Sequence, residues 1–158
     1  SNADLITCCT CGRQVRYTPT KELEGIGHQH PFRFVNDWYE YQKDFINALD
    51  VTTLTARPIY EDTASVYEVI LYQRKELLEK DAAIVLYGNR VLLGQRELSF
   101  DDISTIAVLG RNKLNIYHST GLYQLKGGKR FNALKYVHIF YRYKNIRKGD
   151  VNGKFLGL

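Results

Sequence analysis

The chain of 158 residues lacks several features that each define a class of protein. It has no run of about 18 apolar residues, which a membrane-spanning helix needs. All three cysteines lie within residues 8–11, so the rest of the chain holds none, and a disulfide-bonded scaffold is excluded. It has no Gly-x-Ser-x-Gly, no phosphate-binding loop and no His-Glu-x-x-His motif. We therefore expect no catalytic site in this chain, which leaves open the activity of a larger parent protein.

Acidic residues are missing from most of the C-terminal third. The whole chain has 22 Lys and Arg against 17 Asp and Glu, a net charge of +5. Residues 1–102 carry 11 basic and 16 acidic side chains (net −5), and residues 103–158 carry 11 basic and 1 acidic (net +10). This asymmetry favours an anionic partner: phospholipid headgroups, nucleic acid or an acidic neighbouring domain. A solvated surface, or one neutralised by a missing domain, would have the same composition.

The N-terminal part of the chain predicts a hairpin and a helix. Residues 14–17 and 31–35 alternate as strands do, which predicts a hairpin with a long tip at 21–27. Apolar side chains then recur at helical spacing over residues 37–49, which predicts an amphipathic helix. The segment that follows, 51–55, is expected to be extended.

From residue 65 onward the pattern is typical of strands, with turn residues between apolar segments. Residues 98–103 are expected to be a short connection, and a helix is expected from about Arg130 to just before Gly149. The predicted strands run through residues 65–73, 82–87, 90–93, 105–109, 114–118 and 122–125.

Strands followed by one helix predict an α+β fold. We expect a pleckstrin-homology-like (PH-like) antiparallel β-barrel or sandwich, capped by the C-terminal helix. A small zinc-ribbon-like hairpin and one helix precede it. The expected domains are residues 4–50 for the hairpin and helix and 51–158 for the β domain. Residues 1–3 are expected to be an expression scar, and the remainder to come from a longer protein.

Cys8-x-x-Cys11-Gly12 is a motif with metal-binding chemistry. Two thiolates three residues apart, on a turn that ends in glycine, can bind one metal ion. The nearest residues able to complete four ligands are His28 and His30, which would face the same way on a strand. We therefore predict a structural Zn²⁺ site of Cys8, Cys11, His28 and His30. A metal-free thiol cluster and a redox pair remain as alternatives.

A second candidate site lies around Gly127 and Gly128. The glycines are expected to leave backbone N–H groups free, and the start of the following helix adds positive potential. Lys126, Lys129 and Arg130 flank these glycines, so we predict that this loop binds an anion or a lipid headgroup. The basic residues at the far end of the same helix are explained by its dipole.

Two stretches of the sequence carry a resemblance to a known family. One is Cys8-x-x-Cys11-Gly with Pro31-Phe-Arg-Phe-Val-Asn-Asp-Trp-Tyr-Glu-Tyr-Gln42. The other includes Ala83-Ile-Val-Leu-Tyr, Leu98-Ser-Phe-Asp-Asp-Ile, Tyr123-Gln-Leu-Lys and Arg130-Phe-Asn-Ala-Leu-Lys-Tyr-Val137. Together they resemble the C-terminal extension of some bacterial, mostly clostridial, 1-acyl-sn-glycerol-3-phosphate acyltransferases. The second also resembles lipid-associated PH and GRAM-type domains. The resemblance implies a membrane-bound parent that makes phosphatidic acid.

In that family, the catalytic histidine and an aspartate five residues later lie in a separate N-terminal domain. Here the positions five residues after the four histidines are Arg33, Val35, Tyr123 and Tyr143, so no catalytic residue carries over. We expect a non-catalytic regulatory or membrane-apposition domain, on the cytoplasmic face of the membrane. Its expected partners are anionic phospholipid or the catalytic domain of the parent.

The alternative is a structural or protein–protein interaction module that binds no lipid, and a homo-oligomer is left open. We do not expect a nucleic-acid partner, because the sequence contains no recognised RNA-binding signature.

Overall fold

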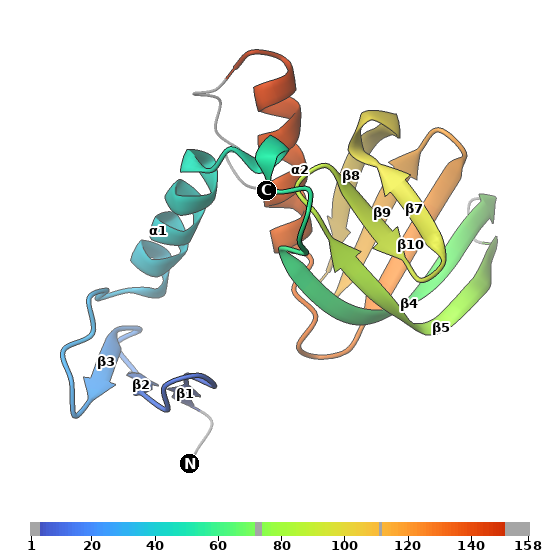
Figure 1. Cartoon of the computed structure of the whole chain (residues 1–158). Coiled ribbons are helices and arrows are strands. Elements are labelled where there is room, and N and C mark those ends of the chain that lie inside the picture. The colour runs from blue at the N-terminus through green and yellow to red at the C-terminus, as the bar shows by residue number, and fades with distance from the viewer. Residues whose placement is uncertain (1–3, 72–73, 111, 151–158) are drawn as a thin grey trace. The chain divides into compact units, whose positions relative to one another are not determined.

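The computed structural model describes residues 4–71, 74–110 and 112–150 (Figure 1). The chain divides into two compact units, residues 1–45 and 46–158, and each unit has its own antiparallel sheet. The domain boundary expected after residue 50 stays a prediction.

The first unit is built on a three-stranded sheet in the order β1-β2-β3. The strands are β1 (Leu5–Thr7), β2 (Gln14–Tyr17) and β3 (Leu23–Ile26). The helix α1 (Val35–Ala48) then begins, close to the predicted start. The Asp37 carboxylate accepts a hydrogen bond of 3.0 Å from the Phe34 N–H, so it satisfies one donor at the helix N-terminus.

The predicted hairpin of residues 14–17 with residues 31–35 is wrong. Residues 23–26, expected to lie in its tip, instead form β3 and pair with β2. The chain reverses earlier than expected because residues 18–21 form a tight turn, in which Lys21 has a φ of +65° and its N–H donates to the Thr18 carbonyl. Residues 31–35 form no strand: Phe34 makes an isolated bridge with Glu22, and the Arg33 carbonyl accepts a hydrogen bond of 2.7 Å from the Leu23 N–H.

The second unit holds a seven-stranded antiparallel sheet in the order β7-β6-β5-β4-β10-β9-β8. The sheet is curled into a half-barrel, with β7 and β8 as its edges (Figure 1). The strands are β4 (Tyr60–Leu71), β5 (Arg74–Leu86), β6 (Arg90–Leu93), β7 (Arg96–Ser99), β8 (Ile103–Leu109), β9 (Lys113–His118) and β10 (Gly121–Gly127).

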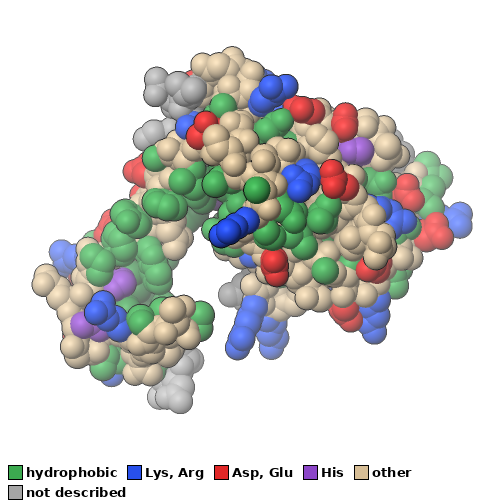
Figure 2. Space-filling model, in the orientation of Figure 1, with side chains coloured by type: hydrophobic (Ala, Val, Ile, Leu, Met, Phe, Trp, Pro, Cys, Tyr) green, Lys and Arg blue, Asp and Glu red, His purple; other side chains and the backbone are tan. Residues whose placement is uncertain are grey.

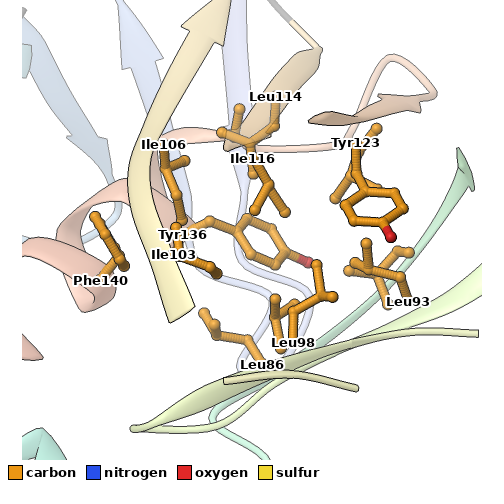
Figure 3. Close-up of a cluster of buried hydrophobic side chains, with 14 of the residues drawn as sticks. Leu86, Leu93, Leu98, Ile103, Ile106, Leu114, Ile116, Tyr123, Tyr136 and Phe140 are labelled. Atoms are coloured by element: carbon orange, nitrogen blue, oxygen red, sulfur yellow. The ribbon is translucent and has the colours of Figure 1, made fainter. Parts of the chain in front are cut away.

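The helix α2 (Leu134–Arg147) completes this unit, because its buried side chains join the hydrophobic core of the sheet. Figure 3 shows Tyr136 of α2 among aliphatic side chains from the strands, and Phe140 of the same helix to one side of them. Both rings are about 1% exposed. Burial of side chains of this size supplies roughly 1.5–3 kcal/mol each, so α2 is an integral part of the core. The expected α+β fold, a PH-like antiparallel sheet with a C-terminal helix, is confirmed.

Polar contacts fix the position of α2 against its neighbours. The Tyr136 hydroxyl donates to the Asp62 carboxylate at 2.5 Å, and the Lys135 ammonium lies 2.6 Å from the same oxygen. The Tyr143 hydroxyl donates to Asp101 at 3.0 Å. Burial is the main reason that the pKa of Tyr136 and that of Tyr143 are both raised, and the hydrogen bond to a carboxylate adds to it.

Three local predictions in this unit are wrong. Residues 51–53 form the 3₁₀ helix η2 (Val51–Thr53), because the Asp50 carboxylate accepts the Thr52 N–H. The expected connection 98–103 contains the end of β7, and the 3₁₀ helix η3 (Phe100–Asp102) follows. The last helix begins at Leu134 and not near Arg130.

Candidate functional site

Lys126 lies on the outer face of the sheet, the face opposite to the core. Its neighbour Leu125 is fully buried, and side chains alternate along a strand, so Lys126 points outward and is exposed. The register places Lys113 of β9 directly opposite Lys126 of β10. Two like charges in this position repel each other, which destabilises the strand pair.

Lys129 and Arg130 lie in the connection between β10 and α2, where both are exposed. We call Lys113, Lys126, Lys129 and Arg130 the basic surface. The ion pairs found in the described part of the chain include none of these four residues. Figure 2 shows Lys and Arg side chains projecting at the lower margin of the larger unit, where Figure 1 places this connection.

The glycine loop differs from the expectation in two ways. The Gly127 N–H is not free, because it donates to the Asn112 carbonyl at 2.9 Å. The Asn112 side chain in turn donates to the Gly127 carbonyl at 2.6 Å. The helix N-terminus lies at Leu134, further along the chain than expected, so the positive potential of the basic surface comes from side chains. The two hydrogen bonds between Asn112 and Gly127 hold the β8–β9 turn against the end of β10.

An apolar groove of about 620 Å³ lies on the same outer face. Leu71 is 66% exposed and Leu109 is 43% exposed. Leu109 lies directly opposite Lys113 in the β8–β9 register, so apolar and basic side chains adjoin each other. The lining residues are Val69, Ile70, Leu71, Leu109, Asn115, Tyr117, Leu122 and Gln124.

Sequence reasoning did not select Lys113, because the pairing of β9 with β10 decides its position. The alternation of Leu114 and Ile116 with polar residues is the signal that could have placed it on the outer face. At the far end of α2, Arg142 is buried and donates to the Leu49 carbonyl at 2.9 Å, so it has a structural role.

The cysteine turn lies between β1 and β2. The Cys8 N–H donates to the Arg13 carbonyl and the Gly12 N–H donates to the Cys8 carbonyl, at 2.9 and 3.0 Å. Gly12 has a φ of +72°, which favours glycine. All three cysteines are exposed free thiols. The pKa of the Cys8 thiol is lowered, mainly by a hydrogen bond from the backbone N–H of Cys11 and to a smaller extent by one from the backbone N–H of Thr10.

The two histidines of the predicted metal site follow β3. One ring nitrogen of His28, Nδ1, lies 3.1 Å from the Ile26 carbonyl. The Nε2 atom of His30 is buried without a hydrogen-bond partner, and its ring packs against Phe32 and Trp38. Within residues 4–71, 74–110 and 112–150, no three Cys, His, Asp or Glu side chains lie close enough to share a metal ion. The metal site stays a prediction.

No protein-family model and no curated protein sequence matches the chain. Among solved structures, the Vps36 N-terminal PH domain is similar to it, with 19% sequence identity and a TM-score of 0.45. That similarity covers 58% of this chain and 82% of the other. The order of strands and helix in the second unit, and not this similarity, identifies the PH-like fold. No helix in the described part of the chain is long and apolar enough to span a membrane.

Proposed function

We propose that the second unit is a non-catalytic binding domain that holds its parent protein against an anionic phospholipid surface. The observation that carries this proposal is the cross-strand pair of Lys113 and Lys126. The pair lacks a compensating carboxylate among the ion pairs of the described residues. An anion placed between the two ammonium groups would relieve their repulsion.

The neighbouring groups support a lipid surface as the source of that anion. Lysine and arginine near an anionic membrane contribute about 1 kcal/mol each, so the four residues of the basic surface supply about 4 kcal/mol. Leu109 beside Lys113 is exposed and adjoins the apolar groove. A surface with adjacent basic and apolar side chains suits the boundary between headgroups and acyl chains.

Co-sedimentation with vesicles tests this proposal. We expect the whole chain to pellet with vesicles that contain phosphatidic acid and not with neutral vesicles. High salt should weaken pelleting, since salt screens exposed charges. Arg57 is also exposed but lies outside the basic surface, so Arg57→Glu is a matched control with the same change in net charge as Lys126→Glu.

Two results would contradict the proposal. One is the absence of pelleting with any vesicle at low salt, which would favour the protein-interaction alternative, in which another domain neutralises the basic surface. The other is equal loss of pelleting in Lys126→Glu and Arg57→Glu, which would show that only the overall charge matters.

We also propose that the parent is a 1-acylglycerol-3-phosphate acyltransferase, so that the bound surface is the cytoplasmic face of the membrane. The resemblance of residues 31–42 and 83–137 to the accessory region of such enzymes supports this proposal. The full open reading frame tests it. We expect a histidine with an aspartate five residues later, upstream of this chain, and a parent without that motif would overturn the proposal.

A further inference from the structure

We propose that the first unit contains a structural zinc site, in which Cys8 and Cys11 bind one Zn²⁺ together with His28 and His30. The strand register brings the two segments to the same end of the three-stranded sheet. Thr7 of β1 pairs with Gln14 of β2, which pairs with Ile26 of β3. The cysteine turn therefore begins directly after β1 at the end of the sheet where β3 ends.

The cysteine turn is shaped to present two ligands. Two backbone hydrogen bonds close the turn, from the Cys8 N–H to the Arg13 carbonyl and from the Gly12 N–H to the Cys8 carbonyl, and both thiols are exposed. A turn of this kind places two sulfur atoms three residues apart on one side of the backbone, which suits two corners of a tetrahedral site. Cys9 lies between them and is not required.

The histidine segment folds back over β3. A Cβ atom added at Gly25 would lie 2.2 Å from the His28 carbonyl and 3.2 Å from its Nε2 atom. The Ile26 carbonyl holds Nδ1 of His28, the kind of contact that fixes the tautomer of a metal-binding imidazole and leaves Nε2 to the metal. The buried Nε2 of His30 has no hydrogen-bond partner, and a metal ion would satisfy it.

The small apolar core of the first unit also supports a metal site. Among its described residues only Val15 and Leu23 are buried apolar side chains. A unit of about 45 residues rarely folds on so small a core without disulfides or a metal, and all three cysteines are free thiols. No three of these side chains lie within reach of one ion in the described residues, so the proposal requires the ligands to turn toward one another when the ion binds.

Titration of the reduced, metal-free chain with Co²⁺ and then Zn²⁺ tests the inference. We expect one ion per chain, intense visible absorption from tetrahedral Co²⁺, and an ultraviolet band from thiolate ligation. The fluorescence of Trp38 should also change, because the His30 ring lies 5.6 Å from its ring. Cys9→Ser is the matched control and should bind as the wild type does.

Cys8→Ser and Cys11→Ser should each weaken the thiolate band, because one thiolate ligand remains, and the double variant should lose it. His28→Ala and His30→Ala should weaken binding at least tenfold. If a variant fails to fold, the spectrum of the metal-loaded wild type still tests whether thiolates bind the ion. The absence of a thiolate band from the reduced wild type would overturn the inference. A disulfide between the two cysteines would also overturn the inference, in favour of a redox pair. Mass spectrometry of the purified, metal-free chain would show it as a loss of two hydrogens that a reductant reverses.

Discussion

Lys126 faces Lys113 across two neighbouring strands, and this pair has a cost for the folded sheet. If Lys126 serves binding, its replacement should affect stability and binding differently. Removal of the repulsion helps the fold, whereas removal of the positive charge harms binding. Stability and binding should therefore move in opposite directions at this residue.

We predict that Lys126→Glu stabilises the protein by about 0.2–1 kcal/mol, because the new carboxylate would face Lys113. Urea unfolding at low salt measures the change, with Arg57→Glu as the control. High salt should reduce the gain, since Lys126 is exposed and Lys113 is only half-buried. A destabilised Lys126→Glu variant would indicate that this lysine supports the fold by a contact of its own.

Tyr136 makes stability depend on pH at the alkaline end. Burial, followed by the hydrogen bond to Asp62, raises the pKa of its phenol above the usual value of about 10. The folded-state pKa lies above the unfolded value, so this contribution to stability is complete below about pH 10 and falls as the pH rises further.

We predict that Tyr136→Phe is less stable than the wild type by about 1–2 kcal/mol at neutral pH, since it loses a hydrogen bond to a carboxylate. The gap should narrow above about pH 10, because only the wild type must keep this phenol protonated. Urea unfolding across that pH range measures the difference, with Tyr41→Phe on an exposed ring as the control. A gap that stays constant with pH would contradict the assignment.

The helices α1 and α2 have very different roles. α2 places seven buried residues in or beside the core, whereas α1 has none. Phe140 of α2 is 1% exposed and Phe45 of α1 is 60% exposed. Replacing each of these two phenylalanines therefore measures how much each helix contributes to the free energy of unfolding.

We predict that Phe140→Ala lowers the free energy of unfolding by about 3–5 kcal/mol, the range for removal of a buried aromatic ring. Phe45→Ala should change it by no more than about 0.5 kcal/mol. Chemical denaturation followed by far-ultraviolet circular dichroism measures both. A large effect at Phe45 would mean that the exposed face of α1 is covered in solution.

Local sequence patterns predicted most strands of the larger unit, but they missed a strand that follows a tight turn and a pair of lysines set by strand register. β9 and β10 were predictable because buried apolar residues such as Leu114, Ile116 and Leu125 recur at every second position. The helix α2 was predicted with a start that lay too early, because it is buried on most of its surface and its apolar pattern marks its ends poorly. β3 was missed because residues 23–26 alternate poorly and the turn at Lys21 decides where the chain reverses. The Lys113–Lys126 pair depends on the register between two strands, which no short pattern encodes.

At the scale of the whole molecule, the chain has two units with very different cores. The larger unit holds almost all of the buried apolar residues, whereas the smaller has Val15 and Leu23. Trp38, the only tryptophan, lies in the smaller unit and reports on it separately. Two units of such unequal stability should not unfold as one.

We predict that Trp38 fluorescence changes at a lower urea concentration than circular dichroism does in the metal-free chain. Zn²⁺ should raise the midpoint of the fluorescence transition and leave the other transition unchanged, because a ligand stabilises only the unit that binds it. Coincident transitions with and without Zn²⁺ would contradict the separation into two units.

The measurement that tests the proposed function most directly is vesicle binding of the wild type and Lys126→Glu in parallel, over a range of salt concentrations. We predict that the wild type binds phosphatidic-acid vesicles at low salt and that Lys126→Glu, although at least as stable, binds several-fold more weakly. We also predict that the two converge as salt rises. Equal binding by both proteins at low salt would contradict the assignment of the basic surface as the lipid-binding site.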